Sequence, residues 1–303
     1  MLLRSRGVAA AVLFGAGAAL SLTACGSNSL SKDSGSSSSQ TVASATVDAA
    51  LAAKLPEKVK TAKKIVVGTD ASYAPSEFLA ADGKTVEGFD VDLFKAVGQK
   101  FGVDVEFVPS SFDSIIAGTN TGKYDVGVSS FTINDKRKQQ ANMVSYYSAG
   151  TQWATAKGNP KNVSPDAACG LKVAVQTGTT QEQDDLPKKQ AACKAAGKPA
   201  IVIQSYQGQD EATAAVATGK ADAMLADSPV GAYAVQKSEG ALMTIGDIYD
   251  SAPYGYVLPK TETDFSQAIA DALKALKADG TYDKVLSKWG VQSGGISDFA
   301  VNP

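Results

Sequence analysis

The sequence predicts an α/β fold with two lobes, each a mainly parallel sheet flanked by helices. From Ile65 onward, short β-like runs alternate with helical patterns, which is typical of sheets built from βα units. Two extended segments, Tyr146–Lys157 and Ser251–Lys260, interrupt this alternation, and we interpret both as chain crossings between the lobes. The length of 303 residues, with 44% hydrophobic content, is sufficient for two compact lobes.

The predicted strands are short runs rich in apolar and β-branched residues. They are Ile65–Gly68, Val103–Val108, Val126–Ser129, Leu171–Gln176, Ala200–Gln204 and Ala223–Ala226. Apolar residues at helical spacing predict helices between and after these strands. The helices are Val91–Phe101, Phe112–Thr119, Thr180–Ala196, Gln209–Thr218, Val230–Lys237, Phe265–Leu276 and Tyr282–Trp289, with a short peripheral helix within Val47–Lys60.

The two crossings divide the folded body into lobes that are not both continuous in sequence. We expect residues 64–150 and 252–292 to form the first lobe and residues 151–251 to form the second. A body joined by two crossings is suited to hinge closure on a ligand.

The amino terminus predicts export and lipid attachment. Residues 1–24 combine a basic start with an apolar run and end in Leu22-Thr23-Ala24, followed by Cys25. This ending resembles a bacterial lipobox, in which cleavage leaves Cys25 as the first residue and lipid is attached to it. The alternative is an ordinary signal peptide that is cleaved elsewhere. Residues 25–46 are rich in Ser and predict a disordered tether, so we expect the mature protein on the outer face of the cell membrane.

Composition excludes several classes of function. The chain has no histidine, which excludes a Ser-His-Asp or Cys-His nucleophile and His-dependent metal sites. Three cysteines are too few for a Cys₄ site, so we expect neither a metal nor a cofactor. The 29 Lys and Arg residues nearly balance 31 Asp and Glu residues, which does not favour a nucleic-acid partner. We expect a monomer.

Cys169 and Cys193 flank the first predicted strand and helix of the second lobe. In an exported chain two such cysteines are expected to form a disulfide, and two buried free thiols are the alternative. Closing a loop of this length stabilises a fold by about 3 kcal/mol in the chain-entropy model.

The stretch from Val126 to Arg137 carries the clearest candidate for a binding site. A buried strand ends in hydroxylated residues, and α/β proteins place ligands at such strand ends. Arg137 lies one to two turns into the following helix-like segment, so its planar guanidinium can point back toward this edge and hold a carboxylate. The alternative is a solvated Arg on a surface helix.

The chain resembles the polar amino-acid-binding family of solute-binding proteins, family 3 of the bacterial extracellular binders, between about Ile65 and Trp289. The resemblance rests on the order of several motifs rather than on any one of them. They are Gly68-Thr69-Asp70 with Tyr73-Ala74-Pro75, Gly88-Phe89-Asp90-Val91-Asp92-Leu93, Ser129-Ser130-Phe131-Thr132 with Arg137, Gln176-Thr177-Gly178-Thr179-Thr180-Gln181, Ser205-Tyr206-Gln207-Gly208-Gln209-Asp210, Ala223 to Asp227, and Asp279-Gly280-Thr281-Tyr282. The resemblance implies the type II periplasmic-binding-protein fold, an L-amino acid ligand, the permease of an ATP-binding-cassette (ABC) importer as partner, and binding without catalysis.

A free amino acid is a zwitterion, so its site needs a cation and an anion a few ångströms apart. We expect Arg137 to hold the carboxylate and Asp227, at a strand end of the second lobe, to hold the ammonium group. Gly178, Thr179 and Thr180 open a helix whose N–H groups favour the same carboxylate. Asp227 and the two threonines could instead act as helix caps, and for the threonines both roles can hold together.

The resemblance implies further ligand-binding residues. The Thr132 and Thr180 amides would complete the carboxylate site, and Ser130 with the Thr132 hydroxyl would complete the ammonium site. Tyr73 and Phe112 would stack on the ligand side chain, although Phe112 could instead be a core residue. Asp70 would meet the distal part of that side chain. Ser129 and Gln181 belong to the same motifs and complete the predicted set.

The identity of the amino acid stays open between two classes. Asp70 suits a basic or an amide side chain, and different motifs are closer to glutamine binders and to basic amino-acid binders. We expect Asp90 and Asp92 to serve the start of their helix rather than to act as paired catalytic acids.

Two other functions compete with capture for transport. An exported cyclohexadienyl or arogenate dehydratase-like enzyme would need a general acid above the ligand, and Asp70 and Glu77 are the available carboxylates. A receptor component that senses an amino acid would use the same site with a different membrane partner.

Overall fold

The structure, a computed structural model, describes residues 46–303. The predicted signal peptide, Cys25 and nearly all of the predicted tether lie outside the described residues. Within residues 46–303, no helix combines the length and apolar character that crossing a membrane requires.

Eight strands form one continuous sheet in the order β5-β1-β6-β11-β7-β10-β8-β9. Their bounds are β1 Lys64–Thr69, β5 Asp104–Pro109, β6 Val126–Gly127, β7 Asn142–Ala156, β8 Lys172–Gln176, β9 Val202–Tyr206, β10 Ala223–Asp227 and β11 Leu242–Leu258. Pairing is parallel among β5, β1 and β6 and among β10, β8 and β9, whereas β7 and β11 pair antiparallel with their neighbours.

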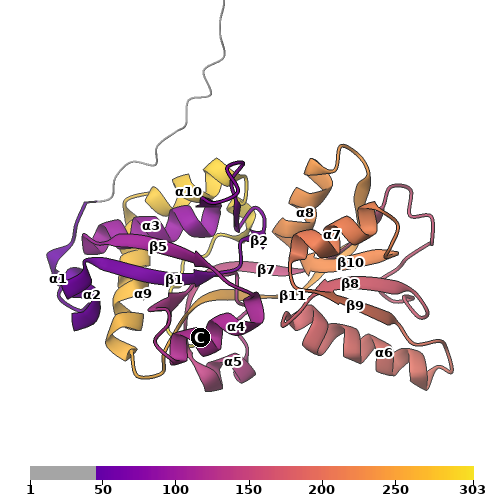
Figure 1. Cartoon of the computed structure of the whole chain (residues 1–303), viewed down its shortest axis with the longest axis horizontal. Helices are drawn as coiled ribbons and strands as arrows, with labels where there is room; N and C mark the ends of the chain where they lie inside the picture. Colours follow the sequence, from indigo (N-terminus) through magenta and orange to yellow (C-terminus); the bar gives the residue numbers. More distant parts are fainter. Residues whose placement is uncertain (1–45) are drawn as a thin grey trace, which may run out of the picture. The chain divides into compact units, whose positions relative to one another are not determined.

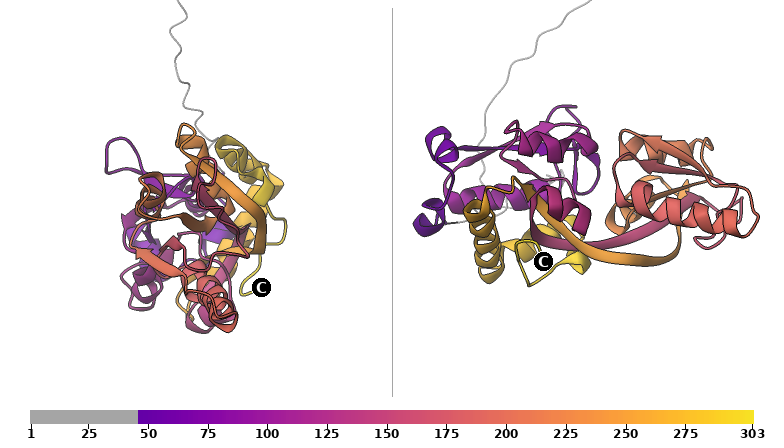
Figure 2. Two further views of the ribbon diagram at one scale, coloured as in Figure 1. Left: turned by 90° about the vertical axis from the view of Figure 1, so that its right-hand side faces the viewer. Right: turned by 90° about the horizontal axis from the view of Figure 1, so that it is seen from below.

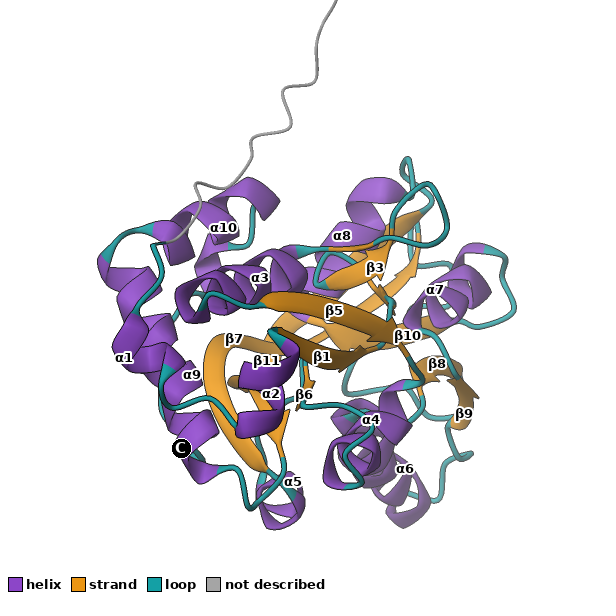
Figure 3. Cartoon of the chain, turned by 60° about the vertical axis from the view of Figure 1, so that its left-hand side comes forward, coloured by secondary structure: helices purple, strands orange, loops and turns teal. Residues whose placement is uncertain are grey.

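The first lobe packs helices on both faces of β5, β1 and β6 (Figure 1). Its helices are α1 Ala49–Ala52, α2 Glu57–Ala62, α3 Phe89–Phe101, α4 Phe112–Asn120, α5 Asp135–Gln140, α9 Thr263–Ala278 and α10 Thr281–Trp289, followed by the 3₁₀ turn η2 Gln292–Gly294. The larger core joins α3, α9 and α10 to the sheet, and a smaller core lies under α4 on the opposite face. Figure 3 shows helices on both sides of the strands.

The second lobe repeats this layering around β10, β8 and β9. Its helices are η1 Gln181–Asp185, which is a π-helix, α6 Leu186–Ala195, α7 Gln209–Ala217 and α8 Ser228–Lys237. One core includes Leu186 and Cys193 of α6, and the other includes Ala212 and Val216 of α7. A disulfide joins Cys169 to Cys193.

The long strands β7 and β11 connect the lobes, as the right-hand view of Figure 2 shows. They pair in both lobes, but the register shifts between Ile245 and Tyr249 and again between Tyr249 and Ala252. Irregular pairing at the crossing leaves fewer regular hydrogen bonds to resist a change in backbone angles. Such irregular pairing is typical of positions where a strand bends.

The predicted fold class is confirmed, and the local errors have clear physical reasons. Both crossings were expected as extended segments, but β7 and β11 are longer because each also belongs to the sheet of both lobes. The short helix expected within Val47–Lys60 is present as α1, and a second helix, α2, follows Pro56 and was not predicted. The small sheet of β2 Ser72–Tyr73, β3 Glu77–Leu79 and β4 Val86–Glu87 was not predicted, because strands of two or three residues carry no periodicity.

Candidate functional site

A small cavity between the lobes brings together nine of the twelve predicted ligand-binding residues. They are Tyr73, Phe112, Ser130, Thr132 and Arg137 of the first lobe and Thr179, Thr180, Gln181 and Asp227 of the second. The carboxyl ends of β6, β8 and β10 meet here, which explains why residues distant in sequence converge. The cavity volume is about 10 Å³, which is room for about one water molecule.

Arg137 is the cation of the cavity and lies on the short helix α5. The side chain of Asn134 caps this helix by accepting a hydrogen bond from the Arg137 amide at 2.9 Å. The guanidinium donates to the Thr132 carbonyl at 2.8 Å and, across the lobes, to the Gly178 carbonyl at 3.1 Å. Burial lowers the pKa of Arg137 to about 10, so the side chain keeps its charge at neutral pH.

Two stacked phenylalanine rings form the wall beside this guanidinium. Phe112 and Phe131 lie 4.6 Å apart between ring centroids with an interplanar angle of 19°. The Arg137 Cζ atom lies 5.4 Å from the Phe112 centroid and 5.5 Å from that of Phe131, within the range of a cation–π interaction. Phe112 therefore serves both predicted roles, because it lines the cavity and packs in the core beneath α4.

Asp227 is the anion of the cavity, and its carboxylate is held from two sides. Oδ1 accepts from Gln181 Nε2 at 2.7 Å, and Oδ2 accepts from the Tyr254 hydroxyl at 2.7 Å. Its backbone N–H donates to the Tyr73 hydroxyl at 3.2 Å. Burial raises the pKa of Asp227 above its ordinary value, while the Tyr254 and Gln181 hydrogen bonds oppose that shift. Asp227 occupies the N-cap position of α8, but its side chain makes no capping hydrogen bond and lines the cavity instead.

The turn from Gly178 to Gln181 supplies the facing edge of the second lobe. Gly178 has a φ of +83°, and its amide donates to Glu182 Oε2 at 2.7 Å. The Thr179 hydroxyl accepts from the Glu182 amide at 3.3 Å, so it acts as a cap while the residue also lines the cavity. The π-helix η1 then turns Gln181 inward, and π-turns are frequent at functional sites.

Three predicted residues lie outside the lining of this cavity. Ser129 and Asp70 are buried behind its wall, and the Ser129 hydroxyl accepts from the Asp70 amide at 3.0 Å. Asp70 Oδ1 accepts from Ser72, and its Oδ2 accepts from the Phe112 amide at 3.0 Å. Burial raises the pKa of Asp70. Gly178 lines an adjoining cavity of about 270 Å³ that shares Phe112 and Arg137 with the first.

Asp70 and Glu77, the two carboxylates considered for a dehydratase, do not line this cavity. Glu77 is fully buried and its Oε1 accepts from the Ser129 hydroxyl at 3.0 Å. Asp90 is also fully buried, and Asp92 accepts from Lys288 and Trp289 on α10. Asp90 and Asp92 therefore stabilise the surroundings of α3 through specific side-chain hydrogen bonds, which the helix dipole alone does not predict.

Tyr254 and Phe131 are site residues that sequence reasoning missed. Tyr254 lies on the crossing strand β11, where the sequence signalled only an extended segment. Its hydroxyl reaches Asp227 only because β11 and β10 both lie beside β7 in the folded sheet. Phe131 stood within a recognised motif, but nothing in the sequence indicated that its ring stacks on Phe112.

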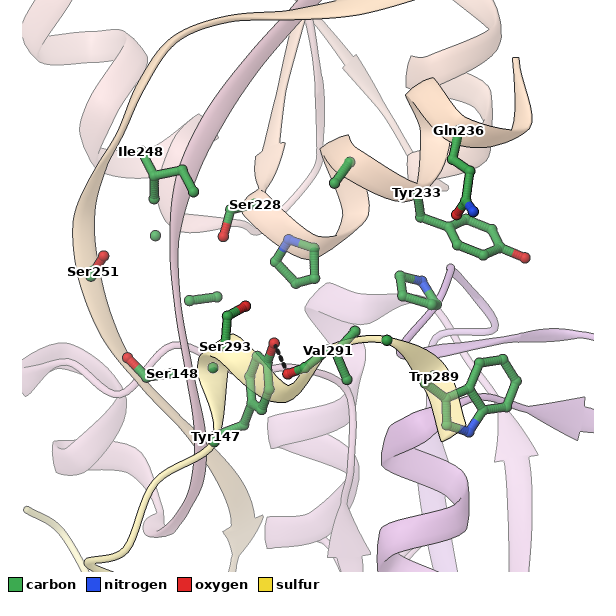
Figure 4. Close-up of a pocket in the computed structure, with 18 residues that line it drawn as sticks. Tyr147, Ser148, Ser228, Tyr233, Gln236, Ile248, Ser251, Trp289, Val291 and Ser293 are labelled. Carbon is green, nitrogen blue, oxygen red and sulfur yellow. Dashed lines mark hydrogen bonds between the residues drawn. The ribbon is translucent and has the colours of Figure 1, made fainter. Parts of the chain in front are cut away.

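A larger cavity of about 550 Å³ lies elsewhere between the lobes (Figure 4). Its walls come from the crossing strands, one face of α8, and the segment from Trp289 to Gly295. The Tyr147 hydroxyl donates to the Val291 carbonyl at 3.0 Å along one wall. None of the residues that line it carries a charged side chain, so it does not complement a zwitterion.

Comparisons with known proteins identify relatives of this chain in sequence and in fold. A sequence profile of the bacterial extracellular solute-binding proteins, family 3, matches residues 65–292. The arginine-binding protein ArgT of Corynebacterium glutamicum is 35% identical over 250 residues, which cover 82% of this chain and 82% of that protein. Two solved structures of ancestral arginine-binding proteins, one bound to arginine and one bound to glutamine, each show a TM-score of 0.68 and 35% identity. They cover 75% and 76% of this chain and 98% of their own chains.

Proposed function

Because the chain belongs to family 3 of the bacterial extracellular solute-binding proteins, we propose that it captures a polar L-amino acid between its lobes and presents it to an ABC importer. The observation that carries this proposal is one cavity lined by a buried cation, Arg137, and a buried anion, Asp227. An amino acid brings the two complementary charges. Capture requires no bond to be made or broken.

The two charged residues have distinct roles in this proposal. Arg137 forms two parallel hydrogen bonds to the ligand carboxylate, and the start of η1 contributes the positive end of its backbone dipoles. Asp227 accepts from the ligand ammonium group. Because Gln181 and Tyr254 already fix its carboxylate, little ordering is needed when the ammonium group arrives.

We propose L-arginine as the first ligand, with L-glutamine as the second. The relatives described above support this order, since ArgT is named for arginine and one ancestral structure holds glutamine. Charge points the same way, because two acidic side chains, Asp70 behind the wall and Asp227 in the cavity, accompany the single guanidinium of Arg137, an excess of one acid. A cationic side chain offsets that excess and a neutral amide does not.

Ligand entry requires the lobes to separate. A volume of about 10 Å³ cannot contain an amino acid, so the cavity has to widen before binding. In this proposal residues 64–150 with 252–292 move against residues 151–251 about the irregular pairing of β7 and β11. Contacts across the lobes, such as Arg137 to Gly178 and Asp227 to Tyr73, then re-form in an altered arrangement around the ligand.

We also propose that lipid on Cys25 holds the protein at the outer face of the cell membrane. The Leu22-Thr23-Ala24-Cys25 motif supports this lipid attachment. At the membrane, the protein's partner in this proposal is the permease of the importer. A Cys25→Ser variant tests the anchor. The proposal predicts that the variant leaves the membrane fraction for the soluble fraction, and equal membrane retention of parent and variant would contradict it.

The experiment that tests capture is thermal unfolding of refolded protein against each common L-amino acid. A ligand that binds only the folded state stabilises it by RT ln(1 + [L]/Kd), about 4 kcal/mol at a thousandfold excess over Kd. We expect the largest rise in Tm with L-arginine. If no amino acid raises Tm, the proposed function is wrong.

A further inference from the structure

Two fully buried acids, Glu77 on β3 and Asp90 at the start of α3, lie directly behind the cavity wall. Glu77 Oε1 accepts from the Ser129 hydroxyl at 3.0 Å. Asp90 Oδ2 accepts from the Ser130 amide at 3.2 Å, the Ser130 hydroxyl at 3.3 Å and the Tyr146 hydroxyl at 2.5 Å. The pair therefore binds both serines of the turn that leads from β6 into the cavity.

The hydrogen bonds from the two serines and Tyr146 leave the second oxygen of each acid without a donor. Glu77 Oε2 and Asp90 Oδ1 are buried without a partner from another residue, while the two carboxyl groups are close enough to hydrogen-bond to each other. Neither acid forms an ion pair with any Lys or Arg in residues 46–303. Two carboxylate oxygens repel each other, so a hydrogen bond between them requires a proton.

The surroundings decide which acid carries this proton. Burial raises the pKa of both groups above their ordinary values, and the negative charge of Asp90 raises that of Glu77 further. Asp90 receives three hydrogen bonds on Oδ2, which favour its ionised form, whereas Glu77 receives one. These contacts favour the ionised form at Asp90 and the proton on Glu77, which then donates to Asp90.

The turn that the pair holds is itself in an unfavourable backbone conformation. Ser130 has a φ of +50°, in the left-handed region that residues other than glycine seldom adopt. Ser130 lines the cavity, and the Ser129 hydroxyl also accepts from the Asp70 amide. The hydrogen bonds that both serines donate to the buried acids are what oppose relaxation of this turn toward an ordinary conformation.

We propose that Glu77 and Asp90 share one proton and together act as positioning residues that fix the Ser129–Ser130 turn for the ligand ammonium group. The positioning of a ligand rests on the proposed function, whereas the shared proton and the fixed turn do not. Above the pH at which Glu77 ionises, two adjacent buried negative charges repel and the turn loosens. Affinity then falls as pH rises.

The other titratable groups that face the pair do not supply a compensating charge. They are Asp70 after β1, Tyr73 on β2, Tyr146 and Tyr147 on β7, Tyr256 on β11 and Tyr282 on α10. The tyrosines are neutral near pH 7, and Asp70 is an acid that cannot supply a positive charge. The proton between the two acids therefore removes one of the two negative charges that would otherwise be buried side by side.

The shared proton is tested without any ligand by infrared spectroscopy of the purified protein. We expect a protonated carboxyl C=O band at pH 7 in the parent that Glu77→Gln removes. Glu77→Gln keeps a donor toward Asp90 and an acceptor for Ser129, whereas Glu77→Leu keeps neither. Exchange of the Ser130 amide hydrogen should be close to the parent rate in Glu77→Gln and at least tenfold faster in Glu77→Leu.

The positioning of ligand is tested by calorimetric titration with L-arginine. We expect the affinity of Glu77→Gln to stay within about threefold of the parent affinity and no longer to fall at high pH. We expect the affinity of Glu77→Leu to be at least tenfold weaker than that of the parent. No protonated carboxyl band in the parent, or unchanged Ser130 exchange in Glu77→Leu, would overturn the inference. If the parent binds no amino acid, the proposed function fails, and the infrared and exchange results still decide the inference.

Discussion

The hydroxyl of Tyr254 offers a perturbation of a single atom at the anion of the site. It donates to Asp227 Oδ2 at 2.7 Å, and both residues are buried. Tyr254→Phe removes this donor without changing the shape of the ring. A buried hydrogen bond to a charged group is worth about 1.5–3 kcal/mol, which corresponds to about one to two pKa units. The pKa of Asp227, already raised by burial, should rise further by that amount.

This shift has two consequences with a defined sign. At pH 7 the ionised carboxylate loses a donor, so the free energy of unfolding should fall by about 1.5–3 kcal/mol. At a pH below the pKa of Asp227 the acid is neutral in both proteins, and the difference should be smaller. Ammonium binding requires the ionised acid, so the pH below which L-arginine affinity declines should move upward.

The assays are denaturant unfolding and calorimetric titration across pH 4–8. Tyr256→Phe is the matched control, because Tyr256 lies two residues along β11, is equally buried, and has a hydroxyl with no hydrogen-bond partner. Removing an unpartnered hydroxyl should cost little stability and leave the affinity profile unchanged. If the two variants have the same stability and lose L-arginine affinity at the same acidic pH, the hydrogen bond assigned between Tyr254 and Asp227 is wrong.

Three further predictions concern Arg137, Gly178 and the Cys169–Cys193 disulfide. Arg137→Met should weaken L-arginine binding by about 2–5 kcal/mol, which is about 30-fold or more. Arg137→Lys should weaken it by less, because lysine keeps the charge but not the two parallel donors. Equal affinity of Arg137→Met and the parent in a titration would contradict the assignment of Arg137 to the ligand carboxylate. Gly178→Ala should cost about 1–2 kcal/mol of stability for its positive φ and should also oppose closure, because its Cβ would lie 2.9 Å from the Asp113 Cβ of the first lobe. Gly197→Ala, with a φ of +65° and open space around it, should show the stability loss alone, so a similar loss of affinity in both would refute the closure effect. The Cys169–Cys193 disulfide spans 24 residues in sequence, and its reduction should lower the free energy of unfolding by about 3 kcal/mol. Ligand affinity should be retained. An unchanged denaturation midpoint after reduction would contradict the predicted loss of stability.

The order of strands and helices was predictable because most elements are long enough to show periodicity. β1, β5, β8 and β10 lie within one or two residues of the predicted strands. The predicted helix Thr180–Ala196 covers both η1 and α6, because the change from a π-helix to an α-helix leaves no signal in apolar spacing. The hairpin of β2 and β3 was missed for the related reason that its strands are too short.

Within the site, residues at strand ends were easier to predict than the contacts that hold them. Arg137 and Asp227 stood out because charge follows an apolar strand in each case. The partners of Asp227 did not, because the Tyr254 hydroxyl and the Gln181 amide reach it from elements distant in sequence. The roles of Asp70 and Ser129 as predicted ligand contacts remain predictions, since both lie behind the cavity wall.

The most direct test of capture by paired charges is calorimetric titration with L-arginine and two of its analogues. Agmatine lacks the carboxylate that Arg137 would hold, and 5-guanidinopentanoic acid lacks the ammonium group that Asp227 would hold. The account predicts that L-arginine binds and that each analogue binds at least 30-fold more weakly, in line with the loss of one buried charge pair of about 2–5 kcal/mol. If either analogue binds as tightly as L-arginine, the cavity between Arg137 and Asp227 does not recognise a zwitterion.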